Sequence, residues 1–293
     1  MKCEKCLKYI YSYLNNLREN DNQNDLLSLC KLLTHSEIKE PSANYKGNDF
    51  NQMPSLYGSP YWDADNTNIM LAIYCVLFEN IKQNNECFKD DNLRFYEYPW
   101  PGRVGETLNS FGTMFGSKNA QNRLANLLVS LDEKKKKHLA KQIELFRSKY
   151  HTPGNFMPFP GSLNYPTSKY NTKGWNYLGD FFGVKLKIIK ENWEKLIEQK
   201  SEIVLLNLNS EFFKKFKNGF DEFQIYFYLE KYEELNFNLC DHSGNNKIPN
   251  PFDYEGCIKY ISNATKIIDY RSEKMAKKLY NIISKTIEVD IDL

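Results

Sequence analysis

The sequence predicts a mainly α-helical protein: a single helical domain with long irregular loops and at most a few short strands. Apolar residues recur at three- and four-residue spacing over most of the chain, which is the pattern of amphipathic helices. Two stretches rich in proline and glycine, residues 36–62 and 151–174, interrupt this pattern. With 293 residues and 41% hydrophobic content, the chain can bury a sizeable core.

Three helices are expected before residue 100. Apolar residues spaced three and four apart predict helices over residues 7–17 and 26–33, with a polar run between them. Asp63, Asp65 and Thr67 can each cap a helix start, and the apolar run that follows them predicts a buried helix over residues 69–83. The segment 94–100 alternates loosely and is typical of a short strand or an extended loop.

Helical spacing resumes after residue 120 and continues almost to the C-terminus. The lysine run 134–137 joins two helical patterns, and we expect it to be a solvated helix face rather than a phosphate site. The patterns predict helices through residues 124–128, 139–146, 175–199, 212–232 and 254–285. Without an internal repeat or a long linker, residues 1–293 form one domain. A finer subdivision has N-terminal helices and a loop over 1–62, a helical core over 63–285 and a tail over 286–293.

Charge and hydropathy exclude several classes of protein. Lys and Arg number 39 against 37 Asp and Glu, so the net charge of +2 argues against nucleic-acid binding. The first residues are too charged for a signal peptide, and the longest apolar run, residues 69–78, is too short to span a membrane. We therefore expect a cytoplasmic protein that does not insert into membranes.

Cysteine usage indicates a reducing compartment. Seven cysteines are scattered along the chain, an odd number that is typical of free thiols. Cys3 and Cys6 form a CxxC pair, but a zinc site needs a second pair of ligands at a recognisable spacing, so we expect Cys6 to face a helix core instead. Nucleotide-binding glycine loops and the common hydrolase and protease motifs are absent. No metal or cofactor is predicted.

The segment 103–111 is the first candidate site. If a helix begins near Gly105, Glu106 and Asn109 share one face, and Arg103 lies just before the helix N-terminus. Such a corner can bind an anion. Alternatively, Arg103 and Glu106 pair simply to close a loop against the core, and Asn109 caps it.

The irregular segment 151–164 is the second candidate site, because rigid loops on helical scaffolds often carry binding groups. His151, Asn155 and Asn164 supply its polar groups, and Lys173 could add a charge. His151 could act as a general acid or base near neutral pH, or it could be a structural histidine bonded to the backbone. The candidate ligand-binding residues are therefore Arg103, Glu106, Asn109, His151, Asn155, Asn164 and Lys173.

Residues 150–277 resemble a family of uncharacterised bacterial proteins, a domain of unknown function. The residues that carry the resemblance are Tyr150, Thr152, Gly154, Asn155, Phe156, Pro160, Gly161, Leu163, Asn164, Asp180, Phe181, Phe182, Phe212, Phe213, Phe220, the run Tyr226–Leu229, Tyr260 and Arg271. This chain departs from the family in having Asn155 where a second glycine is common and in lacking an Arg-Gly pair after Asn164. The stretch 103–111 with the His151 loop is similar to that of proteins from Gram-positive bacteria and their phages. The resemblance implies a mostly helical fold and a bacterial or phage cytoplasmic origin, and it implies no activity.

The first functional hypothesis is a protein-interaction factor, for example a phage product that blocks a host defence enzyme or a component of such a system. It follows from the missing catalytic motifs, the near-zero net charge and the aromatic-rich irregular segments. Tyr and Trp anchor many protein interfaces. The expected interface residues are Tyr57, Tyr61, Trp62 and Trp100.

The alternative hypothesis is an enzyme or receptor for a small phosphorylated or nucleotide-like ligand, built from segments 103–109 and 151–164. Arg103 and Lys173 would hold the anion, and His151 or Glu106 would transfer the proton. This version requires Arg103 and His151 to converge in one pocket. The sequence leaves open whether the protein is an enzyme and in which oligomeric state it works.

Overall fold

The computed structural model describes residues 4–21, 25–38, 67–81, 106–109, 111, 115, 118–159, 182–200, 209–239 and 253–289. The fold of these residues is mainly α, as the sequence predicts. Their helices are α1 (Glu4–Asp21), α2 (Leu26–His35), α3 (Asn68–Leu77), α4 (Lys118–Ser130), α5 (Glu133–Tyr150), α6 (Phe182–Glu191), α7 (Trp193–Ile197), α9 (Ser210–Phe213), α10 (Phe220–Tyr226), α11 (Glu230–Glu234) and α12 (Tyr254–Val289). Two 3-10 helices, η3 (Glu79–Ile81) and η5 (Pro153–Asn155), and two strands, β1 (Glu106–Thr107) and β2 (Phe156–Met157), complete the described elements.

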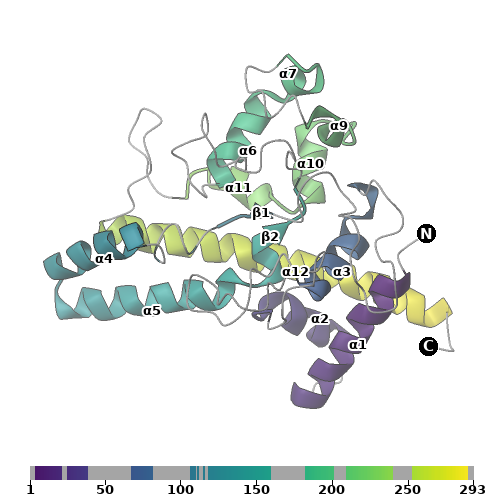
Figure 1. Cartoon of the computed structure of the whole chain (residues 1–293), viewed down its shortest axis with the longest axis horizontal. Coiled ribbons are helices and arrows are strands. Elements are labelled where there is room, and N and C mark those ends of the chain that lie inside the picture. Colours follow the sequence, from purple (N-terminus) through teal and green to yellow (C-terminus); the bar gives the residue numbers. More distant parts are fainter. Residues whose placement is uncertain are drawn as a thin grey trace, which may run out of the picture.

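The long C-terminal helix α12, here called the spine, lies between the other groups of helices (Figure 1). Its 36 residues span about 54 Å at the usual rise of 1.5 Å per residue. In Figure 1, α1, α2 and α5 lie on its lower side, and the short helices α6 to α11 lie on its upper side, with β1 and β2 between. The sequence predicts this helix over 254–285, and the structure extends it to Val289.

One broad face of α12 is buried between the helices on its two sides. Tyr260, Ile267, Ile268 and Met275 are at most 1% exposed, and so is Arg271, which lies on the same side as Ile267 and Met275. The opposite stripe of the helix carries the exposed residues Lys266, Lys274 and Lys277. Helix α12 therefore packs against both groups of helices and keeps one stripe exposed.

The helices on the lower side follow the sequence pattern closely. α1 and α5 are uninterrupted 18-residue helices. The side chain of Asp25 accepts the Ser28 backbone N–H at 2.8 Å at the start of α2, and Asp132 does the same for Lys135 at the start of α5. Cys6 is fully buried in α1, so the expectation that it faces the core is confirmed.

The prediction of one helix over 212–232 is wrong. The structure divides residues 209–239 into α9, α10 and α11, with four, seven and five residues. Gly219 has a φ of 82° and Tyr228 a φ of 58°, and neither angle fits an α-helix. The chain therefore turns before α10 and again after it.

The prediction of one helix over 175–199 is also wrong for its described part. α6 ends at Glu191 and α7 begins at Trp193. The side chain of Asn192 donates to the carbonyl of Ile188 at 2.9 Å, the bond that competes with a regular helix. Residues before 182 lie outside the described part of the chain.

An aromatic cluster explains why the upper side consists of short helices. The ring of Phe223 lies 5.2–5.7 Å from the rings of Phe213, Phe216, Trp193 and Phe227, measured between centroids. Edge-to-face and tilted pairs of this kind need rings to approach from several directions. Several short helices can supply those directions, whereas one straight helix can present only a single stripe.

Candidate functional site

A two-stranded antiparallel ribbon brings the two candidate segments together. Glu106 lies opposite Met157, and Thr107 lies opposite Phe156. The expectation that Glu106 and Asn109 share one face of a helix is wrong, because residues 106–107 pair their backbone with β2 instead. The expectation that residues 151–174 lack regular structure is wrong for 153–157, which form η5 and β2.

Asn155 connects the two segments through its side chain. Its amide nitrogen donates to the carbonyls of Asn109 and Tyr150, each at 2.9 Å. Its side-chain oxygen accepts the backbone N–H of Asn109 at 3.0 Å and the side-chain amide of Asn109 at 3.2 Å. The Asn155 carbonyl also accepts the Leu108 N–H at 2.9 Å. Both donors and both acceptor positions of the Asn155 amide are therefore occupied within the protein.

Tyr232 extends this network to the upper side of the molecule. Its hydroxyl donates to the side-chain oxygen of Asn109 at 3.3 Å. Full burial raises the pKa of Tyr232 above its usual value, so the hydroxyl keeps its proton and remains a donor. Tyr232 belongs to α11, and the bond ties that helix to the segment that follows β1.

Arg271 is the charged group at the middle of the molecule. Its Nε donates to the carbonyl of Phe227 at 3.1 Å, and both terminal nitrogens donate to the carbonyl of Phe156 at 3.1 Å. Nη1 also donates to the carbonyl of Gly154. Burial lowers the pKa of Arg271 to about 10, which leaves the guanidinium charged at neutral pH. One side chain thus holds α12, the η5–β2 segment and the end of α10 together.

Gly154 allows the η5–β2 segment to approach α12 this closely. A Cβ at this position would lie 2.2 Å from the Ser272 Oγ and 2.4 Å from the Ile268 carbonyl oxygen. Side chains do not tolerate such distances, so glycine is required by the close contact rather than by a turn.

His151 lies at the C-terminal end of α5 and is 1% exposed. Burial lowers the pKa of His151 from 6.5 to about 4, so its ring is neutral near pH 7. The ring lies 4.4 Å from that of Tyr150, and its Nδ1 lies 3.9 Å from the Glu37 carboxylate. Its carbonyl accepts the Ile38 N–H at 3.2 Å. These contacts favour the structural interpretation of His151.

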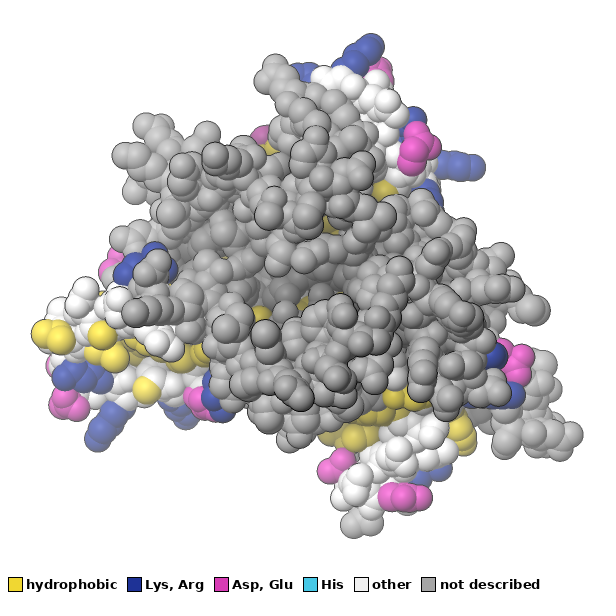
Figure 2. All heavy atoms as spheres, viewed as in Figure 1, with side chains coloured by type: hydrophobic (Ala, Val, Ile, Leu, Met, Phe, Trp, Pro, Cys, Tyr) yellow, Lys and Arg dark blue, Asp and Glu magenta, His cyan; other side chains and the backbone are white. Residues whose placement is uncertain are grey.

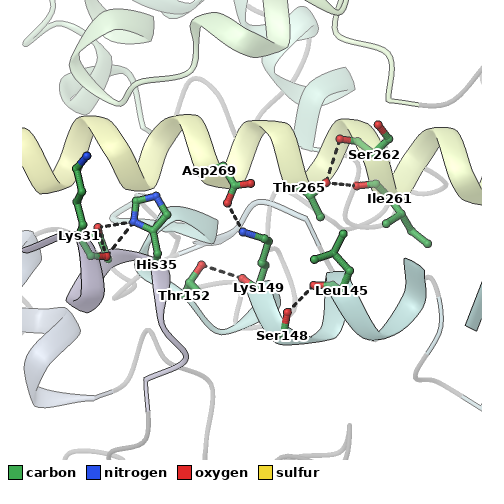
Figure 3. A network of polar contacts seen from close by, with 11 residues as sticks. Lys31, His35, Leu145, Ser148, Lys149, Thr152, Ile261, Ser262, Thr265 and Asp269 are labelled. Atoms are coloured by element: carbon green, nitrogen blue, oxygen red, sulfur yellow. Dashed lines mark hydrogen bonds and ion pairs between the residues drawn. The ribbon is translucent and has the colours of Figure 1, made fainter. Parts of the chain in front are cut away.

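Polar contacts also connect α2 and α5 to the spine (Figure 3). Lys149 of α5 forms an ion pair with Asp269 of α12, and its carbonyl accepts the Thr152 hydroxyl at 2.8 Å. From α2, Lys31 Nζ lies 3.3 Å from the Glu273 carboxylate of α12, while His35 Nδ1 lies 2.9 Å from the Lys31 carbonyl within α2 itself. Figure 3 shows Lys31, His35, Lys149 and Thr152 beside α12, with Lys149 directed toward Asp269.

Of the seven candidate ligand-binding residues, the structure joins Asn109 and Asn155 by hydrogen bonds, and it places His151 next to Tyr150, whose carbonyl accepts the Asn155 amide. Glu106 is described only through its backbone in β1. Arg103, Asn164 and Lys173 lie outside the described residues, and so do the expected interface residues Tyr57, Tyr61, Trp62 and Trp100. The expected convergence of Arg103 and His151 therefore stays a prediction.

Sequence reasoning missed Arg271 and Tyr232 as members of this network. A signal for Arg271 is present, since Ile267, Arg271 and Met275 stand at four-residue spacing and thus on one helix face. An arginine within an apolar stripe indicates a buried charge that needs several acceptors. Tyr232 has no comparable signal in the sequence.

The side chains of Asn109, Asn155, Tyr232 and Arg271, here called the polar centre, are all buried. The hydrogen bonds described above run between these side chains and to backbone N–H and carbonyl groups, so the polar centre has a structural role. Within the described ranges, no three His, Cys, Asp or Glu side chains gather as metal ligands would. The polar centre holds segments in place and offers solvent no acid, base or nucleophile.

The outward surface of α5 has a different character. Lys134, Lys137 and Lys141 are exposed and follow three- and four-residue spacing, so they share one face of the helix. Leu145, one turn further along, is 41% exposed. Figure 2 shows blue, yellow and magenta side chains next to one another at the end of the molecule formed by α4 and α5. We call these four residues the α5 outer face.

No protein-family description, curated protein or solved structure matches this chain. The resemblance of residues 150–277 to a bacterial family accordingly stays a prediction. Of the helices described here, none has both the length and the apolar character to cross a bilayer.

Proposed function

We propose that this protein is a protein-interaction factor that acts by binding another protein. One contrast carries this proposal. The polar groups of the polar centre are buried and bonded internally, while apolar and charged side chains are exposed on the surrounding helices. The large apolar side chains exposed among the described residues are Val129 (86%), Leu145 (41%) and Ile225 (60%).

The resemblance to bacterial and phage proteins directs the search for a partner to bacterial cytoplasmic proteins. A phage product that blocks a host defence enzyme, or a component of a defence system, would work through surface contacts and would need no catalytic motif. Its helical core would serve to hold the contact surface rigid. Rigid presentation reduces the ordering cost of binding.

The enzyme or receptor alternative gains less support from the described residues. The Asn155 amide is fully satisfied by internal bonds, and the Asn109 side chain is buried with its amide bonded to Asn155 and its oxygen bonded to Tyr232. With a pKa of about 4, His151 would be a weak base at neutral pH. Its burial also keeps it from solvent.

Affinity capture tests the interaction proposal directly. The tagged full chain is incubated with bacterial lysate that has been treated with nuclease and cleared of membranes, and bound proteins are quantified. We expect one protein to be retained in a stoichiometric amount. Retention of no such protein, also after chemical crosslinking, would sink the proposal.

A thermal-shift screen tests the alternative in the same preparation. A ligand at a hundred times its Kd adds about 2.7 kcal/mol to the stability of the protein that binds it. If the protein is an interaction factor, nucleotides and phosphorylated metabolites should leave its Tm unchanged. A reproducible increase in Tm with one of them would favour the ligand-binding alternative.

A further inference from the structure

The acidic residues of α5 are already paired, and this leaves the lysines of its outer face without neutralising partners. Glu133 pairs with Lys136 at 2.8 Å, and Glu144 pairs with Arg147 at 3.4 Å. No acidic side chain of the described chain lies within ion-pair distance of Lys134, Lys137 or Lys141. The three ammonium groups therefore form an exposed positive patch on a protein whose net charge is only +2.

The α5 outer face also includes an exposed apolar side chain, Leu145. From Lys134 to Leu145 the α5 outer face extends over 11 residues, or about 16 Å at 1.5 Å per residue. A single exposed leucine needs no explanation by itself. Here, however, Leu145 continues the helical row of the three lysines, so that one partner surface can reach all four side chains.

We infer that the α5 outer face binds an acidic segment of a partner protein, one that presents a row of Asp or Glu side chains beside an apolar residue. Ion pairs would form with Lys134, Lys137 and Lys141, and the apolar residue would cover Leu145. This inference rests on the proposed function and names the surface and the chemistry of its partner.

Two features favour a protein over a polyanion such as RNA or an anionic membrane. Glu133 and Glu144 flank the lysines, and their carboxylates would repel a continuous row of phosphates. A phosphate backbone would also gain nothing from covering Leu145. A protein segment, in contrast, can place its carboxylates only where the lysines lie and can bury an apolar side chain next to them.

Zero-length carbodiimide coupling gives the sharpest test, because it joins a lysine to an Asp or Glu only where the two are in contact. The probe is bacterial lysate protein freed of nucleic acid and membranes, added to the tagged full chain. We expect mass spectrometry to find Lys134, Lys137 or Lys141 joined to an acidic segment of the retained protein.

A charge-matched pair of variants separates the surface from the total charge. The first variant carries Lys134→Gln, Lys137→Gln and Lys141→Gln. The control carries Lys195→Gln, Lys217→Gln and Lys285→Gln, three exposed lysines on other elements. Losing three surface ion pairs should weaken retention by the first variant roughly tenfold. The control should bind as the unmodified chain does, and thermal melts should show both variants folded.

The outcomes distinguish this inference from the proposed function. A partner that both variants retain equally, or whose crosslinks avoid α5, overturns the α5 assignment and leaves the interaction proposal standing. Binding confined to RNA oligonucleotides or phosphatidylserine vesicles, added in separate arms, overturns the choice of a protein partner. Retention of no protein at all overturns both.

Discussion

The helices on the two sides of α12 agree with the predictions from apolar spacing to different degrees. On the lower side, the predicted helices 7–17 and 139–146 are each part of one uninterrupted 18-residue helix, α1 and α5. On the upper side, residues 209–239 form α9, α10 and α11, although their apolar spacing also predicts one helix. The same kind of evidence is therefore reliable on one side and misleading on the other.

Side-chain type explains this difference. The buried residues of α5 (Leu139, Phe146 and Tyr150) form one stripe with polar residues around it. In α10 and its flanks, by contrast, Phe220, Phe223 and Phe227 pack against aromatic partners in several directions. Where apolar residues crowd a segment, periodicity no longer identifies a single buried face, and tertiary packing decides where the helix breaks.

The substitution Arg271→Met should have the largest effect on stability, because it removes the side chain that hydrogen-bonds α12 to the η5–β2 segment and to the end of α10. The carbonyls of Gly154, Phe156 and Phe227 would lose their buried donor. Each unsatisfied buried acceptor costs about 1–3 kcal/mol, so the loss of a donor to three carbonyls should lower the free energy of unfolding by at least about 3 kcal/mol. Urea titration measures this change.

Hydrogen exchange then tests whether Arg271 holds both sides. In Arg271→Met, amides of α5 and of α10 should both lose protection. Lys266→Met changes an exposed cation of the same helix and should alter stability by less than about 0.5 kcal/mol. If the two variants melt alike, Arg271 has no joining role.

Gly154→Ala should be the next most destabilising change. It alters the position at which the η5–β2 segment contacts α12. The new methyl would collide with the Ser272 Oγ and the Ile268 carbonyl. Overpacking of this kind costs about 1–3 kcal/mol. The double variant Gly154→Ala with Ser272→Ala should recover only part of the loss, since the Ile268 carbonyl remains in the way. Complete recovery in a thermal melt would show that backbone contact is not limiting.

The burial of His151, at the end of α5 on the lower side, predicts that the free energy of unfolding depends on pH. The pKa of this residue is about 4 in the folded protein, against 6.5 as its ordinary value, so the unfolded chain takes up the proton more readily. Its contribution to stability is complete above pH 6.5 and decreases as the pH falls toward 4. By linkage, folding should lose about 2 kcal/mol between pH 7 and pH 5.

Comparing the chain with His151→Phe isolates this contribution. The variant should lack most of the stability loss between pH 7 and pH 5, because the carboxylates whose pKa is lowered by pairing, such as Glu233 and Glu273, titrate at lower pH. Chemical denaturation at several pH values provides the measurement. Parallel pH profiles for the two proteins would mean that His151 is not the group responsible.

Sequence reasoning identified the helical class and the limits of α2 to within two residues, whereas for α5 it predicted only the central residues 139–146. The structure pairs residues 106–107 with 156–157, while the convergence of Arg103 and His151 stays a prediction. Sequence reasoning failed for Glu106, because a two-residue strand leaves almost no periodic signal and depends on a partner 51 positions away. It also treated Asn109 and Asn155 as ligand-binding groups. Amide side chains that bind backbone and those that bind ligands have the same appearance in a sequence, and only the bonding partners distinguish them.

Two glycine substitutions should have the smallest effects on stability. They test the comparison between interrupted and regular helices directly, because the two changes in stability should have opposite signs. Gly219 opens α10 with a φ of 82°, which alanine adopts only under strain, so Gly219→Ala should destabilise the protein by about 1 kcal/mol. Gly256 lies in the first turn of α12, where its N–H is capped by the Asp253 side chain and its helical backbone suits alanine, so Gly256→Ala should stabilise the protein by about 0.5 kcal/mol. Thermal melts of both variants measure these shifts. If both changes stabilise the protein, the turn before α10 does not depend on glycine, and the upper side must owe its short helices to aromatic packing alone.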